Sequence, residues 1–429
     1  MDNTITQGGN KNLNIVNNYA PININQTPKC NLSDEQIYSD FIIASEDLNV
    51  HKSFFGKDSN IYIERKDVKD IEDWIFKDLD PNDGTIAVIA GNAGYGKSVI
   101  AKQLFHSLRN KQIPVLALKS DKLVVNNVEE LIKELGFEFQ IDDLVQKLSE
   151  DAERIVVIID QIDALSQSLS SNRNPLNTYN RLINRISKIG PKVRLVISCR
   201  IYDLEYDPYL QQYNNLKKFI IKKLDDDEIK QVLKGLEISP ETLSAKFLDF
   251  LKVPIHLEIF SIVFDRNKPI EFSSLQELYA EYWRKKILSD NLKDDSALVF
   301  IKELSNKMFT KQCITIDQRP FENRYLSAIR YLISEGVIVS NGNKIQFVHQ
   351  SFFDYTNARC FVDDERSISN EILKENNHQG LFIRSGLRHI LTYLREIRVD
   401  EYIHELKILL YIHQLRSEEH TSELQSRLH

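Results

Sequence analysis

The segment from Gly91 to Ser98 reads GNAGYGKS and fits the pattern GxxxxGK followed by Ser or Thr. The continuous apolar run TIAVIA at 85–90 precedes it, and a helical pattern over 98–110 follows it. A glycine-rich turn between a buried strand and a helix points successive backbone N–H groups at phosphate oxygens, and the positive end of the helix dipole adds to the attraction. The segment therefore predicts a phosphate-binding loop.

Two side chains of this loop carry specific chemistry. We expect the Lys97 ammonium to reach the β- and γ-phosphates of a nucleotide and the Ser98 hydroxyl to be a Mg²⁺ ligand. The alternative is a chance match in a loop that contains glycines, and the flanking strand and helix argue against it. The nucleotide-binding residues expected from this stretch are Gly91, Asn92, Ala93, Gly94, Tyr95, Gly96, Lys97, Ser98 and Val99.

Apolar strands and helices alternate around the loop. Apolar strands separated by helices predict a parallel sheet with helices on both faces, so we expect a P-loop NTPase fold of the α/β class, its core at 81–224. Glycines at 136 and 190 are expected to stop two of the helices. The expected strands are 85–90, 113–119, 154–160, 193–200 and 217–224, and the expected helices are 98–110, 128–136, 141–153 and 179–190.

Charged residues follow two of these strands. Asp160 ends the run IVVIID, and we expect it to hold the Mg²⁺ shell through water, because Mg²⁺ keeps several waters. Asp163 follows three residues later and is expected to orient or deprotonate the attacking water, with a helix N-cap as the alternative. Arg200 ends VRLVISCR and is expected to face the γ-phosphate, with a solvated strand-end arginine as the alternative.

The pattern becomes helical after the core, and we expect a helical lid there. Farther on, GVIVSNGNKIQFVHQSF reads as a strand, an Asn-Gly turn and a second strand, and helices followed by such a hairpin predict a winged helix. The expected organisation is an Asn-rich flexible N-terminus at 1–31, a mostly helical segment at 32–80, the core at 81–224, the lid at 225–290, the winged helix at 291–365 and the start of an α-helical array at 366–415.

Composition excludes several classes of protein. The 429 residues carry a formal net charge of −7, which argues against a general nucleic-acid coat. No apolar run is long enough to cross a membrane, and no secretory signal precedes the first domain. The 4 cysteines are widely scattered and form no disulfide framework or metal knuckle. We therefore expect a cytoplasmic protein that has no membrane partner.

The last segment, 416–429, needs a separate reading. Residues Arg416 to Ser426 match, residue for residue, the translation of a common sequencing adapter. We therefore expect 416–429 to be a disordered artefact and the natural protein to continue beyond Leu415. A solvated polar tail is the alternative.

An ordered set of motifs resembles the STAND class of P-loop NTPases, most closely its NACHT-like bacterial members, over roughly residues 60–415. The class includes innate-immunity sensors and bacterial anti-phage proteins. The motifs are GNAGYGKS, VVIIDQIDAL, LVISCR, LKVPIHLEIF at 251–260, LQELYAEYW at 275–283 and FVHQSFFDYTNARCF at 347–361.

The resemblance implies further site residues. Pro254 would pack against the adenine, and the alternative is a proline that kinks a lid helix. His349 would reach the β-phosphate of ADP and hold a closed, inactive form, and the alternative is a structural histidine. The stretch Ile63-Glu64-Arg65 resembles the segment that covers the base.

The resemblance also has departures. The family pattern after the acidic strand ends in an acid, where this chain has Ala164, so we expect slow hydrolysis. The sensor motif Thr-Ser-Arg reads Ser-Cys-Arg here.

The function implied is an ATP/ADP-binding switch with bound Mg²⁺ that hydrolyses ATP slowly. A trigger, a protein or ligand of unknown identity, would promote opening and homo-oligomerisation in bacterial signalling or anti-phage defence. ATP rather than GTP rests on the resemblance, and nucleic acid is not an expected partner.

Two alternatives remain open. One is an AAA-type initiator or loader ATPase that binds DNA through the winged helix, and the other is a nucleotide-dependent scaffold without hydrolysis.

Overall fold

The computed structural model describes residues 30–50, 54–56, 61–79, 84–167, 174–265, 272, 274–288, 295–374 and 381–411. The proposed adapter tail and nearly all of the Asn-rich N-terminus lie outside these residues. Within the part that is described, no helix combines the length and apolarity needed to cross a membrane.

A five-stranded parallel sheet forms the core, with the strand order β4-β5-β6-β3-β7. Nearly every side chain of the inner strands is buried, which explains their continuous apolar sequences. β6 lies between β5, the strand that ends in Asp160, and the phosphate-loop strand β3. The strands are β3 Ile86–Gly91, β4 Val115–Lys119, β5 Ile155–Asp160, β6 Val193–Arg200 and β7 Lys217–Ile220.

Helices cover both faces of this sheet, as the sequence predicted. Successive residues of β3 point to opposite faces, so Val88 and Ala90 pack with α1, α4, α5, α6 and α7, whereas Ala87 and Ile89 pack with α2 and α3. The helices are α1 Asp34–Ala44, α2 Lys66–Phe76, α3 Lys97–Asn110, α4 Val128–Leu135, α5 Ile141–Asp151, α6 Ile162–Gln167, α7 Asn174–Ile186 and α8 Ile201–Tyr206.

The structure confirms one of the two predicted glycine helix ends and differs from the predicted content of the segment 32–80. Gly136 caps α4 in the left-handed conformation, at φ 72°, as expected. The expected glycine stop at Gly190 is wrong, because α7 already ends at Ile186. The segment 32–80, expected to be mostly helical, also contains the antiparallel strands β1 (Phe54–Phe55) and β2 (Ile61–Tyr62).

The lid follows the sheet as a group of helices. Asp225 accepts N–H bonds from the first turn of α9 and forms a capping box with Glu228. Pro254 occupies the first turn of α11, where its missing N–H has no intrahelical acceptor to lose. It therefore starts a helix and does not kink one. The lid helices are α9 Asp226–Gly235, α10 Ala245–Leu251, α11 Pro254–Val263 and α12 Leu275–Lys286.

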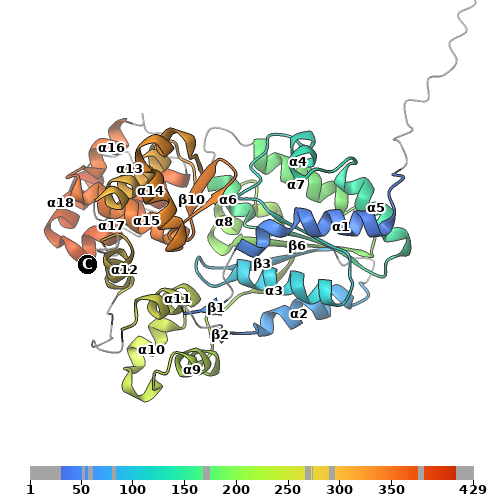
Figure 1. Cartoon of the computed structure of the whole chain (residues 1–429), viewed down its shortest axis with the longest axis horizontal. Coiled ribbons are helices and arrows are strands. Elements are labelled where there is room, and N and C mark those ends of the chain that lie inside the picture. Colours follow the sequence, from blue (N-terminus) through green and yellow to red (C-terminus); the bar gives the residue numbers. More distant parts are fainter. Residues whose placement is uncertain are drawn as a thin grey trace, which may run out of the picture.

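The C-terminal part contains a three-stranded antiparallel sheet in the order β8-β10-β9. Gly342, at φ 56°, closes the β9–β10 hairpin, as the Asn-Gly pair predicted. One apolar cluster joins this part to the lid, and Figure 1 shows both beside the core. The elements are α13 Ser296–Thr310, β8 Ile316–Asp317, α14 Arg319–Ser334, β9 Ile338–Asn341, β10 Lys344–Phe347, α15 Gln350–Asp363, α16 Ile368–Lys374, α17 Leu381–Ile397 and α18 Val399–Tyr411.

Candidate nucleotide-binding site

The phosphate loop has the local structure that its glycines predict. Gly94 and Gly96 adopt positive φ angles of 77° and 88°, a conformation that residues with a Cβ rarely adopt. Gly96 precedes the first residue of α3, so the amino end of that helix opens at the loop. The loop therefore combines a curled backbone with the positive end of a helix dipole, which together favour an anion.

Lys97 lies inside this loop with its side chain almost fully buried. Its Nζ donates hydrogen bonds to the carbonyl oxygens of Gly91, at 2.9 Å, and Asn92, at 3.1 Å. Burial lowers the pKa of Lys97, and the Asp163 carboxylate opposes this effect. A buried ammonium held by neutral carbonyls gains from an incoming phosphate, because the phosphate supplies the negative charge that the carbonyls lack.

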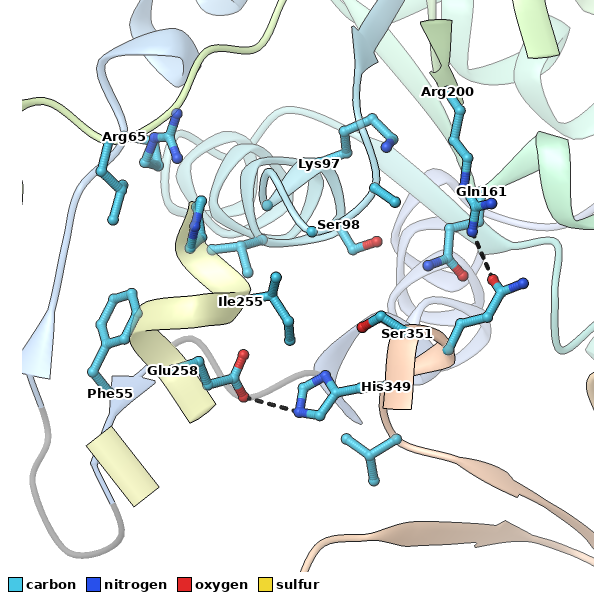
Figure 2. Close-up of a pocket in the computed structure, with 18 of the residues that line it drawn as sticks. Phe55, Arg65, Lys97, Ser98, Gln161, Arg200, Ile255, Glu258, His349 and Ser351 are labelled. Atoms are coloured by element: carbon cyan, nitrogen blue, oxygen red, sulfur yellow. Dashed lines mark hydrogen bonds and ion pairs between the residues drawn. The ribbon is translucent and has the colours of Figure 1, made fainter. Parts of the chain in front are cut away.

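The loop opens into a cavity of about 1350 Å³, counting the space that communicates with solvent. Figure 2 shows that its walls come from the core, the lid, the C-terminal part and the segment before α2. The cavity thus lies where the strand ends of the sheet meet the other domains. Its lining comprises Phe54, Phe55, Ile63, Arg65, Ala93, Gly94, Gly96, Lys97, Ser98, Val99, Gln161, Asp163, Ala164, Arg200, Leu224, Pro254, Ile255, Glu258, Val348, His349, Gln350 and Ser351.

Asp163 and Arg200 face each other in this cavity. Arg200 Nε lies 3.1 Å from Asp163 Oδ2, and Arg200 Nη2 donates to Gln350 Oε1 at 2.7 Å. Burial alone would lower the pKa of Arg200, but the Asp163 and Asp203 carboxylates raise it above the usual value. Arg200 therefore stays charged while it connects the core to the start of α15.

Asp160 has a different environment, because it is fully buried and does not line the cavity. Its Oδ1 accepts a hydrogen bond from Ser198 Oγ, and its Oδ2 lies 3.6 Å from Lys119 Nζ. Lys119 Nζ also contacts Asp121 Oδ1 at 3.0 Å. Burial would lower the pKa of Lys119, but Asp121 and Asp160 raise it, so the buried lysine carries a charge between two carboxylates.

The carboxylates beside the loop fit a Mg²⁺ ion. Asp163 Oδ1 is buried and accepts no hydrogen bond within the described part of the chain, whereas Asp160 Oδ2 lies beside the Lys119 ammonium. Hard oxygen atoms without donors are the ligands that Mg²⁺ prefers, and Ser98 adds a hydroxyl in the cavity wall. These residues would hold Mg²⁺ together with nucleotide phosphates, and the ion would neutralise phosphate charge there.

The lid touches the phosphate loop directly. The backbone N–H of Ile255 donates to Gly94 O at 3.2 Å. A Cβ built on Gly94 would lie 2.4 Å from Ile255 Cγ2, and one built on Gly96 would lie 3.8 Å from Pro254 Cγ. Pro254 therefore lies against the loop and lines the cavity, and its contact with an adenine stays a prediction.

His349 comes from the C-terminal part and points toward the lid. Its Nε2 lies 3.2 Å from Glu258 Oε1, and Figure 2 shows this pair across the cavity from Ser98. Next to it, Tyr279 OH donates to Ser351 Oγ at 2.7 Å. His349 therefore lines the cavity with the lid carboxylate as one of its partners, and its contact with a β-phosphate stays a prediction.

Arg65 closes the end of the cavity that the segment before α2 forms. Its Nη2 donates to Asp67 Oδ2 at 3.0 Å and to Lys222 O at 3.1 Å. Its side chain is buried, and Ile63 and Phe55 line the same wall. The stretch Ile63-Glu64-Arg65, which was expected to cover the nucleotide base, therefore borders the cavity through Ile63 and Arg65.

Sequence reasoning missed Lys119, Gln161 and Glu258. Lys119 ends the apolar run VLALK, and a charge at the end of a buried strand was a usable signal. Glu258 lies one helical turn after Pro254, so both fall on one face of α11. Gln161 carries no sequence signal of its own, because its importance comes from a backbone conformation.

Comparison with known proteins gives one family match. The family model described as Novel STAND NTPase 3 matches residues 81–235. No curated protein sequence matches the chain.

Several solved structures are similar to this chain at low identity and low TM-score. A Walker-type ATPase of Pyrococcus abyssi has 12% identity and a TM-score of 0.38, covering 71% of this chain and 98% of its own. The Aeropyrum pernix ORC2 protein in its ADP form has 14% identity and a TM-score of 0.31, covering 74% and 98%. DnaA from Aquifex aeolicus, bound to AMPPCP, has 12% identity and a TM-score of 0.32, covering 82% and 96%. The parallel sheet and the phosphate loop before α3 give the core of this chain a P-loop NTPase fold, and residues 81–235 are similar to a STAND NTPase family.

Proposed function

We propose that this protein is an ATP/ADP-binding switch of the STAND type, whose lid and C-terminal part close over the phosphate loop. One observation carries the proposal: each pair of these three parts is joined by a polar contact at the cavity. Ile255 joins lid to loop, His349–Glu258 joins the C-terminal part to the lid, and Arg200–Gln350 joins the core to the C-terminal part.

The Arg200–Gln350 contact gives a reason for a nucleotide to change the conformation. Arg200 forms an ion pair with Asp163, whereas Gln350, which accepts its hydrogen bond from the C-terminal part, is a neutral amide. A γ-phosphate would be a stronger acceptor than an amide, because it adds a negative charge, and a geometry that a guanidinium can engage with two N–H groups, to a bond whose donor is already ionised. ATP would therefore draw Arg200 from Gln350 and favour opening, whereas ADP would leave the contact in place.

We expect slow hydrolysis because of the side chains that follow β5. Asp163 is the cavity carboxylate nearest the end of β5, and Arg200 engages one of its oxygens. The buried Ala164 stands where an additional acid would help to activate water. A switch needs lasting nucleotide states, so weak catalysis suits this role.

The wider role of the switch follows from the resemblance and from the match to a STAND family. We place the protein in bacterial signalling or anti-phage defence, where a trigger would release the closed form for homo-oligomerisation. The order α13, β8, kinked α14, β9, β10 agrees with a winged helix that acts as the moving part. In this role the hairpin end faces the nucleotide cavity.

The test is nucleotide binding by the full chain, measured by equilibrium titration with fluorescent ATP and ADP analogues. Lys97→Ala should lower the affinity for both nucleotides at least tenfold, because it removes the phosphate-facing ammonium. Lys102→Ala is the matched control, since Lys102 lies on the same helix and donates to Asn49 O outside the cavity. Equal affinities in the wild type and Lys97→Ala would overturn the site.

A further inference from the structure

Gln161 has a backbone conformation that side chains rarely adopt. Its φ is 59°, in the left-handed region that favours glycine. Both of its backbone groups are engaged: its N–H donates to Ser198 Oγ at 2.8 Å, and its carbonyl accepts from Ala164 N–H at 2.9 Å. Strained residues of this kind gather at functional sites, where the surrounding structure enforces them.

The side chain of Gln161 is oriented by a buried lysine. Lys119 Nζ donates to Gln161 Oε1 at 2.9 Å. An ammonium only donates hydrogen bonds, so this contact requires the carbonyl oxygen of the amide to face Lys119. Lys119 is itself 1% exposed and held by Asp121. The Gln161 amide therefore has one orientation, with its NH₂ group turned away from the lysine.

The NH₂ group of Gln161 is directed into the nucleotide cavity. Gln161 lines this cavity together with Ser98, Asp163 and Arg200, and Figure 2 shows it on the wall that carries Arg200. No hydrogen bond from Nε2 is present within the described part of the chain. The amide thus offers two N–H donors on the side of the cavity where the γ-phosphate would lie.

We propose that Gln161 recognises the γ-phosphate of ATP, and that Lys119 is the positioning residue that holds its amide for this contact. This inference rests on the proposed function and adds, beside Arg200, a second group that distinguishes the triphosphate from the diphosphate. Nε2 donates to an oxygen that ATP has and ADP lacks. An amide takes up no proton, so the contact contributes binding and no proton transfer.

The size of the effect follows from the charge of the acceptor. Hydrogen bonds to charged groups are stronger than neutral ones, and removing one changes affinity by about tenfold or more. Gln161→Gly deletes the donor and also relieves the positive φ, so loss of binding cannot be ascribed to added strain. The ratio of ATP affinity to ADP affinity should fall about tenfold in Gln161→Gly.

Gln112→Gly is the matched control. Gln112 also has a φ of 59°, is exposed, and follows α3 outside the cavity. It should gain the same relief of strain with the ATP-to-ADP affinity ratio unchanged.

Lys119→Arg tests the positioning role, because it keeps a cation beside Asp121 and displaces the donor that Gln161 uses. It should lower the affinity ratio in the wild-type background and have no further effect in a Gln161→Gly background. A purely structural role of Lys119 would give the same change in both backgrounds.

The measurement is titration of the full chain with fluorescent ATP and ADP analogues, with Mg²⁺ present. If the wild type binds neither nucleotide, the proposed function fails. If the wild type binds both and Gln161→Gly has the same affinity ratio as Gln112→Gly, the proposed function stands and the role of Gln161 is refuted.

Discussion

Gly94→Ala should open the lid, because the lid occupies the space that a side chain would need. A Cβ on Gly94 would lie 2.4 Å from Ile255 Cγ2 and 3.2 Å from Ile255 Cβ. Overpacking of this kind costs about 1–3 kcal/mol, which is roughly a 5- to 150-fold change in an equilibrium. The positive φ of 77° adds strain, but that strain is present whether the lid is docked or released.

Hydrogen exchange at one amide measures this opening. The Ile255 N–H lies in the first turn of α11, where helix amides have no intrahelical acceptor, and it donates to Gly94 O. Its protection therefore reports lid docking. In nucleotide-free Gly94→Ala, exchange of a peptide containing Ile255 should accelerate roughly 5- to 150-fold.

Two further variants separate the clash from backbone strain. Ile255→Ala introduced into Gly94→Ala removes the colliding atom and should restore part of the protection. Gly342→Ala adds a Cβ at a φ of 56° with no atom within 4 Å, so it should leave the Ile255 exchange rate unchanged. Unchanged exchange in Gly94→Ala, or equal exchange in the single and double variants, would refute the docking of lid on loop.

Two other substitutions test buried charges. Lys97→Met should raise the thermal unfolding midpoint of the nucleotide-free protein. Burial lowers the pKa of Lys97, so folding disfavours its charged form, and this destabilisation is largest at pH values below the folded pKa and is lost as the pH rises toward the unfolded value. Scanning fluorimetry should also show that added ATP no longer stabilises the variant, and a lower midpoint would contradict the reasoning. Lys119→Met should destabilise the fold by about 3–5 kcal/mol in urea titrations, because Asp121 and Asp160 lose their buried cation. A loss under about 1 kcal/mol would show that the two carboxylates do not need it.

The sequence was enough to predict the sheet, because every inner strand is an uninterrupted apolar run with a helix-length segment after it. The sequence was not enough to predict strands of only two residues. Strands of two residues, such as β1 and β8, leave no alternation to detect. The end of α7 was missed for another reason: the chain leaves the helix at Ile186 through a turn that needs no glycine.

The site could be predicted where a motif fixes a local backbone, as in the phosphate loop. The positions of Asp160 and Gln161 could not be predicted in this way. The sequence shows a carboxylate at a strand end, but the structure shows that Lys119, on the adjacent strand, lies beside it. A contact between neighbouring strands depends on the order of the strands in the sheet. That order cannot be predicted from the succession of strands and helices along one sequence.

The strength of the contacts around the cavity sets what a nucleotide can do. The His349–Glu258 pair is partly exposed and contributes up to about 1 kcal/mol. The Ile255–Gly94 hydrogen bond adds about 1 kcal/mol, and the charged Arg200–Gln350 bond about 1.5–3 kcal/mol. Together these contacts amount to about 2.5–5 kcal/mol, which is less than the roughly 5.5 kcal/mol that moves a two-state equilibrium from 1:99 to 99:1. A γ-phosphate that takes Arg200 from Gln350 would remove the strongest of them, so one phosphate has enough free energy to shift the closed population substantially.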